Sequence, residues 1–226
     1  MRDDICTIPV SEVFEEQNGC PICRMRKTVE EHLITYILGD AMMEPDVRIQ
    51  TNKIGFCSKH YDKMLAHRGR LQLALMLETH IKEISSEIFD KKLFNSIDKK
   101  ADKSKQVIDS CFICDKVNWG IERMTETIYR CYEKESDFRR MFNAQPQFCL
   151  HHFEYLASGA DKKSMPKYHS EFKENLTRIT AEYVKSLGDD LNKYCSMYDY
   201  RNAKNGDWGN SADAVERAVA FLEGKL

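Results

Sequence analysis

Glycine and proline are scarce in this 226-residue chain, which contains 10 glycines and 5 prolines. Few positions therefore interrupt regular structure, and apolar side chains recur at spacings of three and four, the period of an α-helix. Strand signals are weak. We predict an all-α fold with helices over residues 24–39, 58–90 with a break at Gly69, 115–134, 168–198 and 211–222, and a short helix capped by Asp46.

Long hydrophobic runs and a large net charge are also missing. The most apolar stretch, Leu71–Leu77, is interrupted by Gln72 and is too short to cross a bilayer. No apolar segment precedes Asp3 and Asp4, so we expect a cytoplasmic protein. The formal net charge of −2, from 34 basic and 36 acidic residues, argues against nucleic acid and membranes as partners.

Recognisable catalytic motifs are absent: the chain has no phosphate-binding glycine loop, HExxH motif or GxSxG elbow. The best candidates for proton transfer are Glu78 and His80, with His32 or His169 as partners. Glu78 and His80 are two positions apart and do not share a helix face. A lone helical histidine is more often a packing residue, so we assign no catalytic residue.

Cysteine, by contrast, occurs at regular positions together with histidine. Two CxxC pairs and two CxxH pairs alternate along the chain: Cys20 and Cys23, Cys57 and His60, Cys111 and Cys114, and Cys149 and His152. The two CxxC pairs are 91 residues apart and the two CxxH pairs are 92 apart. We interpret this repetition as an internal duplication in which each half is a helical bundle.

A CxxC pair and a CxxH pair together supply three thiolates and one imidazole, which close a tetrahedral metal site. Thiolate ligands favour zinc or iron over magnesium, calcium or manganese. We predict two zinc ions per chain, one in each half, with Cys20 and Cys23 joined by Cys57 and His60, and the later pairs joined likewise. His151 is an alternative to His152. The alternative cofactor is an iron–sulfur cluster held by the same residues.

Disulfides and reduced core cysteines are the competing interpretations of these motifs. The cysteine count of nine is odd, and Cys6, Cys131 and Cys195 lie outside the motifs, where burial as small apolar side chains explains them. Three thiolates and a neutral imidazole give a zinc site a charge near −1. Arg24, Lys27 or Lys59 are candidates to offset that charge.

The composition divides the chain into four segments. Residues 1–94 form the first metal-stapled repeat, 95–109 a lysine-rich connection, 110–200 the second repeat and 201–226 an aromatic and polar tail with a C-terminal helix capped by Ser211. Tyr198, Tyr200 and Trp208 are expected to pin this tail across the bundle.

Three segments carry a family resemblance: Gly55-Phe-Cys-Ser-Lys-His-Tyr61, Arg70-Leu-Gln-Leu-Ala-Leu-Met-Leu-Glu-Thr-His80, and Asp199-Tyr-Arg-Asn202 with Asp207-Trp-Gly-Asn210. With them the chain resembles an uncharacterised family of Firmicutes-type bacterial proteins that share the CxxC and Phe-Cys-x-x-His motifs and are sometimes labelled transporter substrate-binding proteins. The resemblance implies a bacterial origin and a shared fold, and it brings no established activity.

Four protein ligands leave no open coordination position for a reacting water, so both metal sites are expected to be structural. The sequence therefore predicts a cytoplasmic zinc-binding helical protein that serves as an interaction module for a protein or small-molecule partner. An iron–sulfur redox or sensing protein is the alternative. Neither the partner nor the oligomeric state is indicated.

Overall fold

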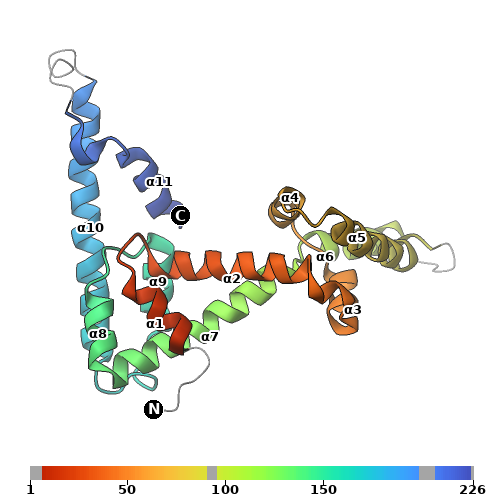
Figure 1. Ribbon diagram of the computed structural model, residues 1–226, viewed down its shortest axis with the longest axis horizontal. Coiled ribbons are helices and arrows are strands. Elements are labelled where there is room, and N and C mark those ends of the chain that lie inside the picture. The colour runs from red at the N-terminus through yellow and green to blue at the C-terminus, as the bar shows by residue number, and fades with distance from the viewer. Residues whose placement is uncertain (1–6, 91–95, 199–206, 225–226) are drawn as a thin grey trace. The chain divides into compact units, whose positions relative to one another are not determined.

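The computed structural model describes residues 7–90, 96–198 and 207–224. Within these ranges the chain forms helices and no β-strand, so the all-α prediction is confirmed (Figure 1). The chain divides into two compact units: unit 1 comprises Met1–Lys27 with Ile121–Leu226, and unit 2 comprises Thr28–Gly120. Unit 1 therefore contains both ends of the chain, whereas the predicted repeats are each continuous in sequence.

Unit 1 has an aromatic core. The ring of Phe142, which is fully buried, lies 5.8 Å from Phe14, 5.1 Å from Tyr132, 5.0 Å from Phe148 and 4.9 Å from Phe172, measured between ring centroids. In Figure 1 the longest helix is α10, and α11 packs against both α10 and α9. The helices of this unit are α1 (Thr7–Glu15), the start of α2 (Pro21–Ile37), most of α7 (Phe112–Lys134), α8 (Ser136–Asn143), α9 (Leu150–Gly159), α10 (His169–Met197), η4 (Gly209–Ser211) and α11 (Ala214–Glu223).

Unit 2 is built around the packing of α3 on α5. The Arg48 guanidinium on α3 donates to Leu75 O at 2.9 Å and to the Thr79 hydroxyl at 2.6 Å, both on α5. Besides the rest of α2 and the start of α7, the unit contains η1 (Asp40–Met43), α3 (Pro45–Ile54), α4 (Ser58–Ala66), α5 (Arg70–Ile84), a π-helical turn η2 (Ser85–Phe89) and α6 (Ile97–Ile108).

The predicted helix ends are only partly correct. Gly69 does separate α4 from α5, as expected. Asp46 lies in the first turn of α3 rather than before it, because Pro45 occupies the first helical position, where its missing N–H costs nothing. Ser211 is not a cap either: it ends the short helix η4, its hydroxyl donates to Trp208 O at 2.6 Å, and α11 begins at Ala214.

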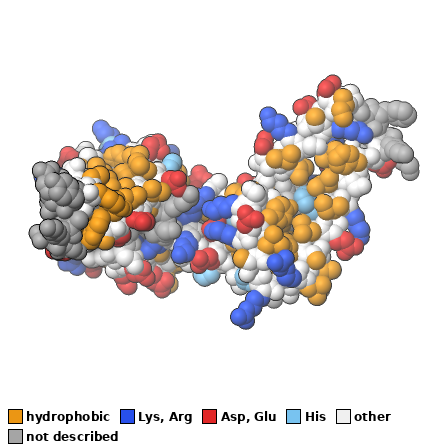
Figure 2. Space-filling view, turned by 90° about the horizontal axis from the view of Figure 1, so that it is seen from above, with side chains coloured by type: hydrophobic (Ala, Val, Ile, Leu, Met, Phe, Trp, Pro, Cys, Tyr) orange, Lys and Arg blue, Asp and Glu red, His pale blue; other side chains and the backbone are white. Residues whose placement is uncertain are grey.

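The expectation for the aromatic tail is only partly correct. The rings of Tyr198 and Trp208 meet, 5.7 Å apart and both beside Tyr194 of α10, but Tyr198 is 70% exposed, so this contact lies at the surface. Tyr200 lies outside the described residues. On α5, the hydrophobic side chains of Leu71 and Ile81 are 68% and 59% exposed. Figure 2 shows hydrophobic side chains on the molecular surface.

None of the helices in the described part of the chain combines the length and the apolar character needed to span a membrane.

Candidate metal centres

The structure brings the eight predicted ligands together in two groups, but it pairs them differently from the sequence prediction. Site 1 consists of Cys20, Cys23, Cys149 and His152, and site 2 consists of Cys57, His60, Cys111 and Cys114. Within each site one sulfur or nitrogen atom from every residue lies within 4.8 Å of all the others. The expected pairing within each half is therefore wrong, although every site still combines one CxxC pair with one CxxH pair.

Helix lengths explain the difference. At a rise of about 1.5 Å per residue, the 17-residue α2 that follows Cys23 is roughly 25 Å long, and the 10-residue α3 that leads to Cys57 is only about 15 Å long. The second half has the same imbalance, because α7 has 23 residues and α8 only eight. In neither half do the two helices match in length, and each CxxH pair completes the site of the other CxxC pair.

All four ligand pairs share one local structure. Cys20, Cys57, Cys111 and Cys149 each immediately precede a helix, and the second ligand of each pair lies in the first turn of that helix. The carbonyl of each leading cysteine accepts the first helical hydrogen bond, at 2.8 to 3.2 Å. Each site therefore collects two helix N-termini, whose partial positive charge stabilises thiolates.

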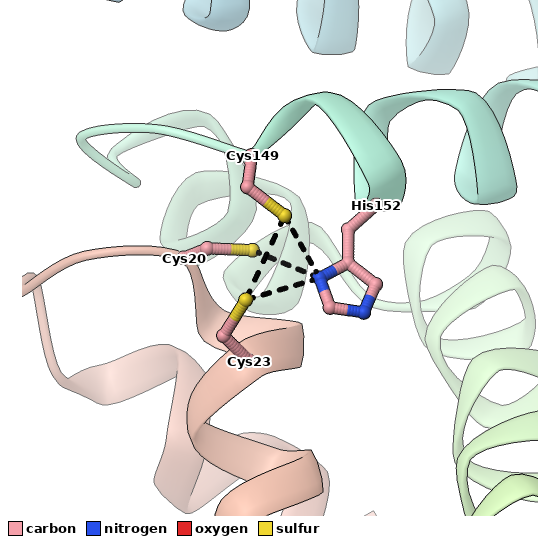
Figure 3. Close-up of side chains that lie close together, drawn as sticks. All are labelled: Cys20, Cys23, Cys149 and His152. Carbon is pink, nitrogen blue, oxygen red and sulfur yellow. Dashed lines mark hydrogen bonds between the residues drawn. The ribbon is translucent and has the colours of Figure 1, made fainter. Parts of the chain in front are cut away.

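Site 1 lies between the starts of α2 and α9, and its four side chains converge on one point (Figure 3). Nδ1 of His152 is 3.1 Å from Cys149 Sγ, 3.2 Å from Cys23 Sγ and 3.5 Å from Cys20 Sγ. The sulfurs of Cys23 and Cys149 are 3.6 Å apart. The three cysteines are at most 5% exposed, so water reaches this site poorly.

Without a cation, the site 1 groups perturb one another strongly. Hydrogen bonds with Cys20 and Cys23 lower the pKa of the Cys149 thiol, whereas hydrogen bonds with Cys149 and Cys20 raise the pKa of Cys23. Burial lowers the pKa of His152, but Cys149 and Cys20 outweigh burial and raise it to about 9. The opposed pKa shifts of Cys149 and Cys23 show that the protein groups alone do not favour several thiolates at once, whereas a central positive charge does.

The C-terminal helix closes site 1 from one side. Gly224 ends α11 in the left-handed conformation with φ of +65°, and its carbonyl oxygen lies 3.3 Å from Cys23 Sγ. A Cβ atom at this position would lie 3.3 Å from the His151 ring and 3.5 Å from Cys149 Sγ. His151, the alternative ligand, is exposed and lies on the side of this glycine where a Cβ would point, whereas His152 points into the site.

Site 2 lies between the starts of α4 and α7. Nδ1 of His60 is 3.2 Å from both Cys57 Sγ and Cys111 Sγ and 3.5 Å from Cys114 Sγ. The sulfurs of Cys57 and Cys114 are 3.9 Å apart, and both residues are partly exposed, unlike Cys111. The donor set is the same as in site 1, but two of its sulfurs are accessible.

A buried carboxylate supports the histidine of site 2. Oε1 of Glu30, a residue only 7% exposed, lies 2.8 Å from His60 Nε2, the ring nitrogen that faces away from the thiols. Lys59 lies 3.2 Å from the same oxygen, and Lys63 contacts Oε2. Such a carboxylate fixes the tautomer and the orientation of a metal-bound imidazole, because it accepts the proton of the nitrogen that does not bind metal.

The charges around Glu30 keep it ionised. Burial raises the pKa of Glu30, but hydrogen bonds from Lys63 and His60 and the charge of Lys59 outweigh burial and lower it to about 2. Burial also lowers the pKa of His60, so this imidazole is neutral near pH 7 and presents a lone pair to a metal. Burial and the neighbouring Cys111 raise the pKa of Cys114 to about 12, which again calls for a cation.

The donor spacings fit a single tetrahedral ion. With metal–sulfur bonds of about 2.3 Å and metal–nitrogen bonds of about 2.0 Å, tetrahedral edges are roughly 3.8 Å between sulfurs and 3.5 Å between sulfur and nitrogen. The sulfur separations of 3.6 Å in site 1 and 3.9 Å in site 2 bracket the first value. Sulfur–nitrogen separations of 3.1 to 3.5 Å approach the second. Both groups can therefore hold a metal ion.

The basic residues proposed to offset the site charge take different positions. Arg24 lies beside site 1 and braces the preceding loop, donating to Val13 O at 2.7 Å and Glu16 O at 2.8 Å. Lys27 is exposed. Lys59 pairs with Glu30, so it reaches site 2 only through that carboxylate.

The remaining candidates do not form a site together. Nδ1 of His80 lies 2.6 Å from Asn52 O, while Glu78 is exposed and pairs with Lys82. His32 is exposed, and His169 contacts Ala160 O. Of the extra cysteines, Cys131 is buried as expected, Cys195 is exposed, contrary to expectation, and Cys6 lies outside the described residues.

Glu30 is the residue that sequence reasoning missed. The apolar residues Met25, Val29, Leu33, Tyr36 and Ile37 lie on one side of α2, yet Tyr36 is 41% exposed. The buried positions also include Glu30 and Ile34, which with Ile37 follow the spacing i, i+4, i+7. The sequence signal that could have identified Glu30 is its helical spacing from Ile34 and Ile37, which places a carboxylate on the same side of the helix as two isoleucines.

No curated protein and no solved structure matches the chain. One family model does, and it covers residues 1–226. The match extends over the full length of the sequence, including the residues of both candidate sites. The chain thus belongs to the family described as "Family of unknown function (DUF6062)".

Proposed function

We propose that this protein binds two zinc ions in structural sites and acts as an interaction module for a protein or small-molecule partner. The observation that carries the proposal is the convergence of three sulfurs and one imidazole nitrogen in each of two groups. Four protein donors complete a tetrahedral shell, so no position is left for a substrate or a reactive water. Zinc has no redox chemistry and suits this soft donor set.

The donor spacing favours a single ion over an iron–sulfur cluster. A cluster with several irons binds its ligands on different metal atoms, which spreads the donors beyond the edge of one tetrahedron. All donors in each site lie within 4.8 Å of one another. Zinc bound here would stabilise the fold, because metal binding to a site that does not exist in the unfolded chain adds to the folding free energy.

Metal analysis with an absorption spectrum tests this proposal. The protein is purified without oxygen and without a metal-binding affinity tag. We expect about two zinc ions per chain and no visible absorbance. Iron with acid-labile sulfide and broad absorbance in the visible range would instead establish the iron–sulfur alternative, and a metal-free, folded protein would refute both.

Paired substitutions test which ligands share an ion. Cys20→Ser with Cys149→Ser removes two ligands of site 1, so this variant should keep about one zinc. Cys20→Ser with Cys57→Ser damages both sites and should keep almost none. Pairing within each half of the sequence predicts the opposite result for the two variants. Circular dichroism of each variant shows whether the undamaged unit remains helical.

A further inference from the structure

A basic cavity of about 620 Å³ lies in unit 1, away from the metal ligands. It forms where the end of α7 and the start of α8 meet the segment that precedes α10. Its lining residues are Glu133, Lys134, Arg139, Lys163, Ser164, Pro166, Lys167 and Tyr168. These residues carry four positive charges and one negative charge, whereas the whole chain has a net charge of −2. The positive charge is therefore concentrated locally.

The backbone that carries two of these lysines is fixed by hydrogen bonds and burial. Near its start, Oδ1 of Asp161 accepts the N–H groups of Lys163 at 3.0 Å and Ser164 at 2.7 Å. In its middle, Met165 is fully buried. At its end, the Glu133 carboxylate accepts the N–H of Lys167 at 3.2 Å. The side chains of Lys163 and Lys167 therefore extend from an ordered backbone.

The nearby carboxylates are already engaged by backbone N–H groups. Glu133 also accepts the N–H of Tyr168 at 3.1 Å, so both of its oxygens are used. In the part of the chain that the structure describes, no ion pair joins Lys134, Lys163 or Lys167 to an acidic residue. Three ammonium groups around the cavity are thus available for an anionic ligand.

Arg139 supplies a fourth, immobilised cation. Its guanidinium lies 3.9 Å from the centre of the Tyr168 ring and donates to Tyr132 O at 2.7 Å. A guanidinium held by stacking and by a backbone carbonyl loses little conformational entropy when a ligand arrives. Arginine and lysine are also the side chains that bind phosphate oxygens best.

We propose that this cavity binds a small molecule that carries two or more linked phosphate groups, such as inorganic triphosphate or the triphosphate of a nucleotide. Four cations around one cavity match several negative charges on one compact ligand. Nucleic acid needs cations spaced along an extended path, and the acidic chain does not provide a general one. The inference gives a ligand class to the interaction role proposed above, and it does not depend on which metal the protein binds.

Isothermal titration calorimetry of the full-length, metal-loaded protein with inorganic triphosphate and with ATP tests the inference, at about 50 mM and about 150 mM sodium chloride. Lys163→Gln with Lys167→Gln should weaken binding about five- to twentyfold, since an exposed charge pair contributes up to about fivefold. Lys162→Gln with Lys185→Gln is the matched control. It removes the same charge from exposed positions outside the cavity lining and should change the affinity less than twofold.

The inference is supported if Lys163→Gln with Lys167→Gln weakens triphosphate binding and the control variant does not. Tighter binding of ATP than of triphosphate would also support it, and would indicate an added contact between the protein and the nucleotide base. Absence of binding by both probes, or equal weakening by the two variants, overturns it. Tighter binding of a single-stranded oligonucleotide than of ATP also overturns it, because an extended polyanion would then be the ligand. Zinc content and helicity, measured on every sample, keep a failure of the metal proposal separate from these outcomes.

Discussion

Glu30 should set the zinc affinity of site 2 without touching the metal. Its carboxylate lies 2.8 Å from His60 Nε2 and is 7% exposed, and removal of such a partner typically costs 10- to 100-fold in metal affinity. In Glu30→Gln the amide oxygen can still accept the His60 proton, so we expect the lower end, about tenfold or 1.4 kcal/mol. Lys59 and Lys63 lose their partner but are 65% and 39% exposed, so both can turn to water.

Glu30→Ala should weaken zinc binding at site 2 more than Glu30→Gln does. It leaves the buried N–H of His60 without an acceptor, which by itself costs about 1–3 kcal/mol, so affinity should fall by about 100-fold. The background variant Cys20→Ser with Cys149→Ser isolates site 2, and a competing chromophoric chelator then measures its affinity.

Glu78→Gln is the control for the Glu30 substitutions, because Glu78 lies in the same unit and pairs with Lys82, but it is exposed. The positioning role of Glu30 is refuted if Glu30→Gln binds zinc at site 2 as tightly as the protein that keeps Glu30. It is also refuted if Glu78→Gln loses as much zinc affinity as Glu30→Gln.

Three further outcomes are expected. Gly55→Ala should destabilise unit 2 by about 1–3 kcal/mol in thermal melts, because Gly55 has φ of +67° and a Cβ would lie 2.6 Å from the His80 ring. Gly188→Ala is the control in unit 1 and should not destabilise that unit, because a Cβ there would meet open space. In zinc-free protein at pH 7.5, imidazole NMR should show His152 protonated and His60 neutral. The pKa of His152, about 9, lies above the ordinary value of 6.5. The stability that protonated His152 contributes is therefore complete below pH 6.5 and is lost as the pH rises through 9. A neutral His152 at pH 7.5 would contradict this expectation. Phe142→Ala should lower the free energy of unfolding of unit 1 by about 3–5 kcal/mol in urea titrations, whereas exposed Phe89→Ala should cost little, and equal losses would contradict the assigned core.

The eight residues that converge in the two candidate sites were predictable from the sequence, because a metal site needs particular residue types at a fixed local spacing. A residue that precedes a helix and one three positions later lie on the same side of its first turn, so CxxC and CxxH each define a pair of donors without any knowledge of the fold. Nothing in Cys20 and Cys23 specifies whether Cys57 or Cys149 completes their site. The two CxxH pairs are chemically equivalent, so only the lengths of the intervening helices separate the alternatives.

The orientation of individual helices was less predictable. In α2 the residues Val29 and Leu33 are as hydrophobic as Ile34, and the periodicity alone does not decide which of these sides is buried more deeply. The structure buries the face that includes Glu30, because this carboxylate reaches His60 and two lysines there. A buried charge is stable only with its partners in place, and those partners come from α4, which sequence periodicity does not connect to α2.

In the observed pairing, site 2 lies within the long loop that site 1 closes, so this pairing is called nested. Its loop-closure entropy is smaller than the loop lengths suggest. In site 1, Cys23 and Cys149 are 126 residues apart, and in site 2, Cys57 and Cys114 are 57 apart, whereas pairing within each half would close loops of about 35 residues. Loop-closure entropy grows only with the logarithm of length, and site 2 shortens the loop that site 1 must close. The nested arrangement therefore costs only about 1 kcal/mol more than the sequential one. Bending or breaking a helix such as α2 or α7 costs about 3 kcal/mol or more. Helix lengths thus outweigh loop lengths, and the CxxC and CxxH pairs that are closest in sequence do not form one candidate site.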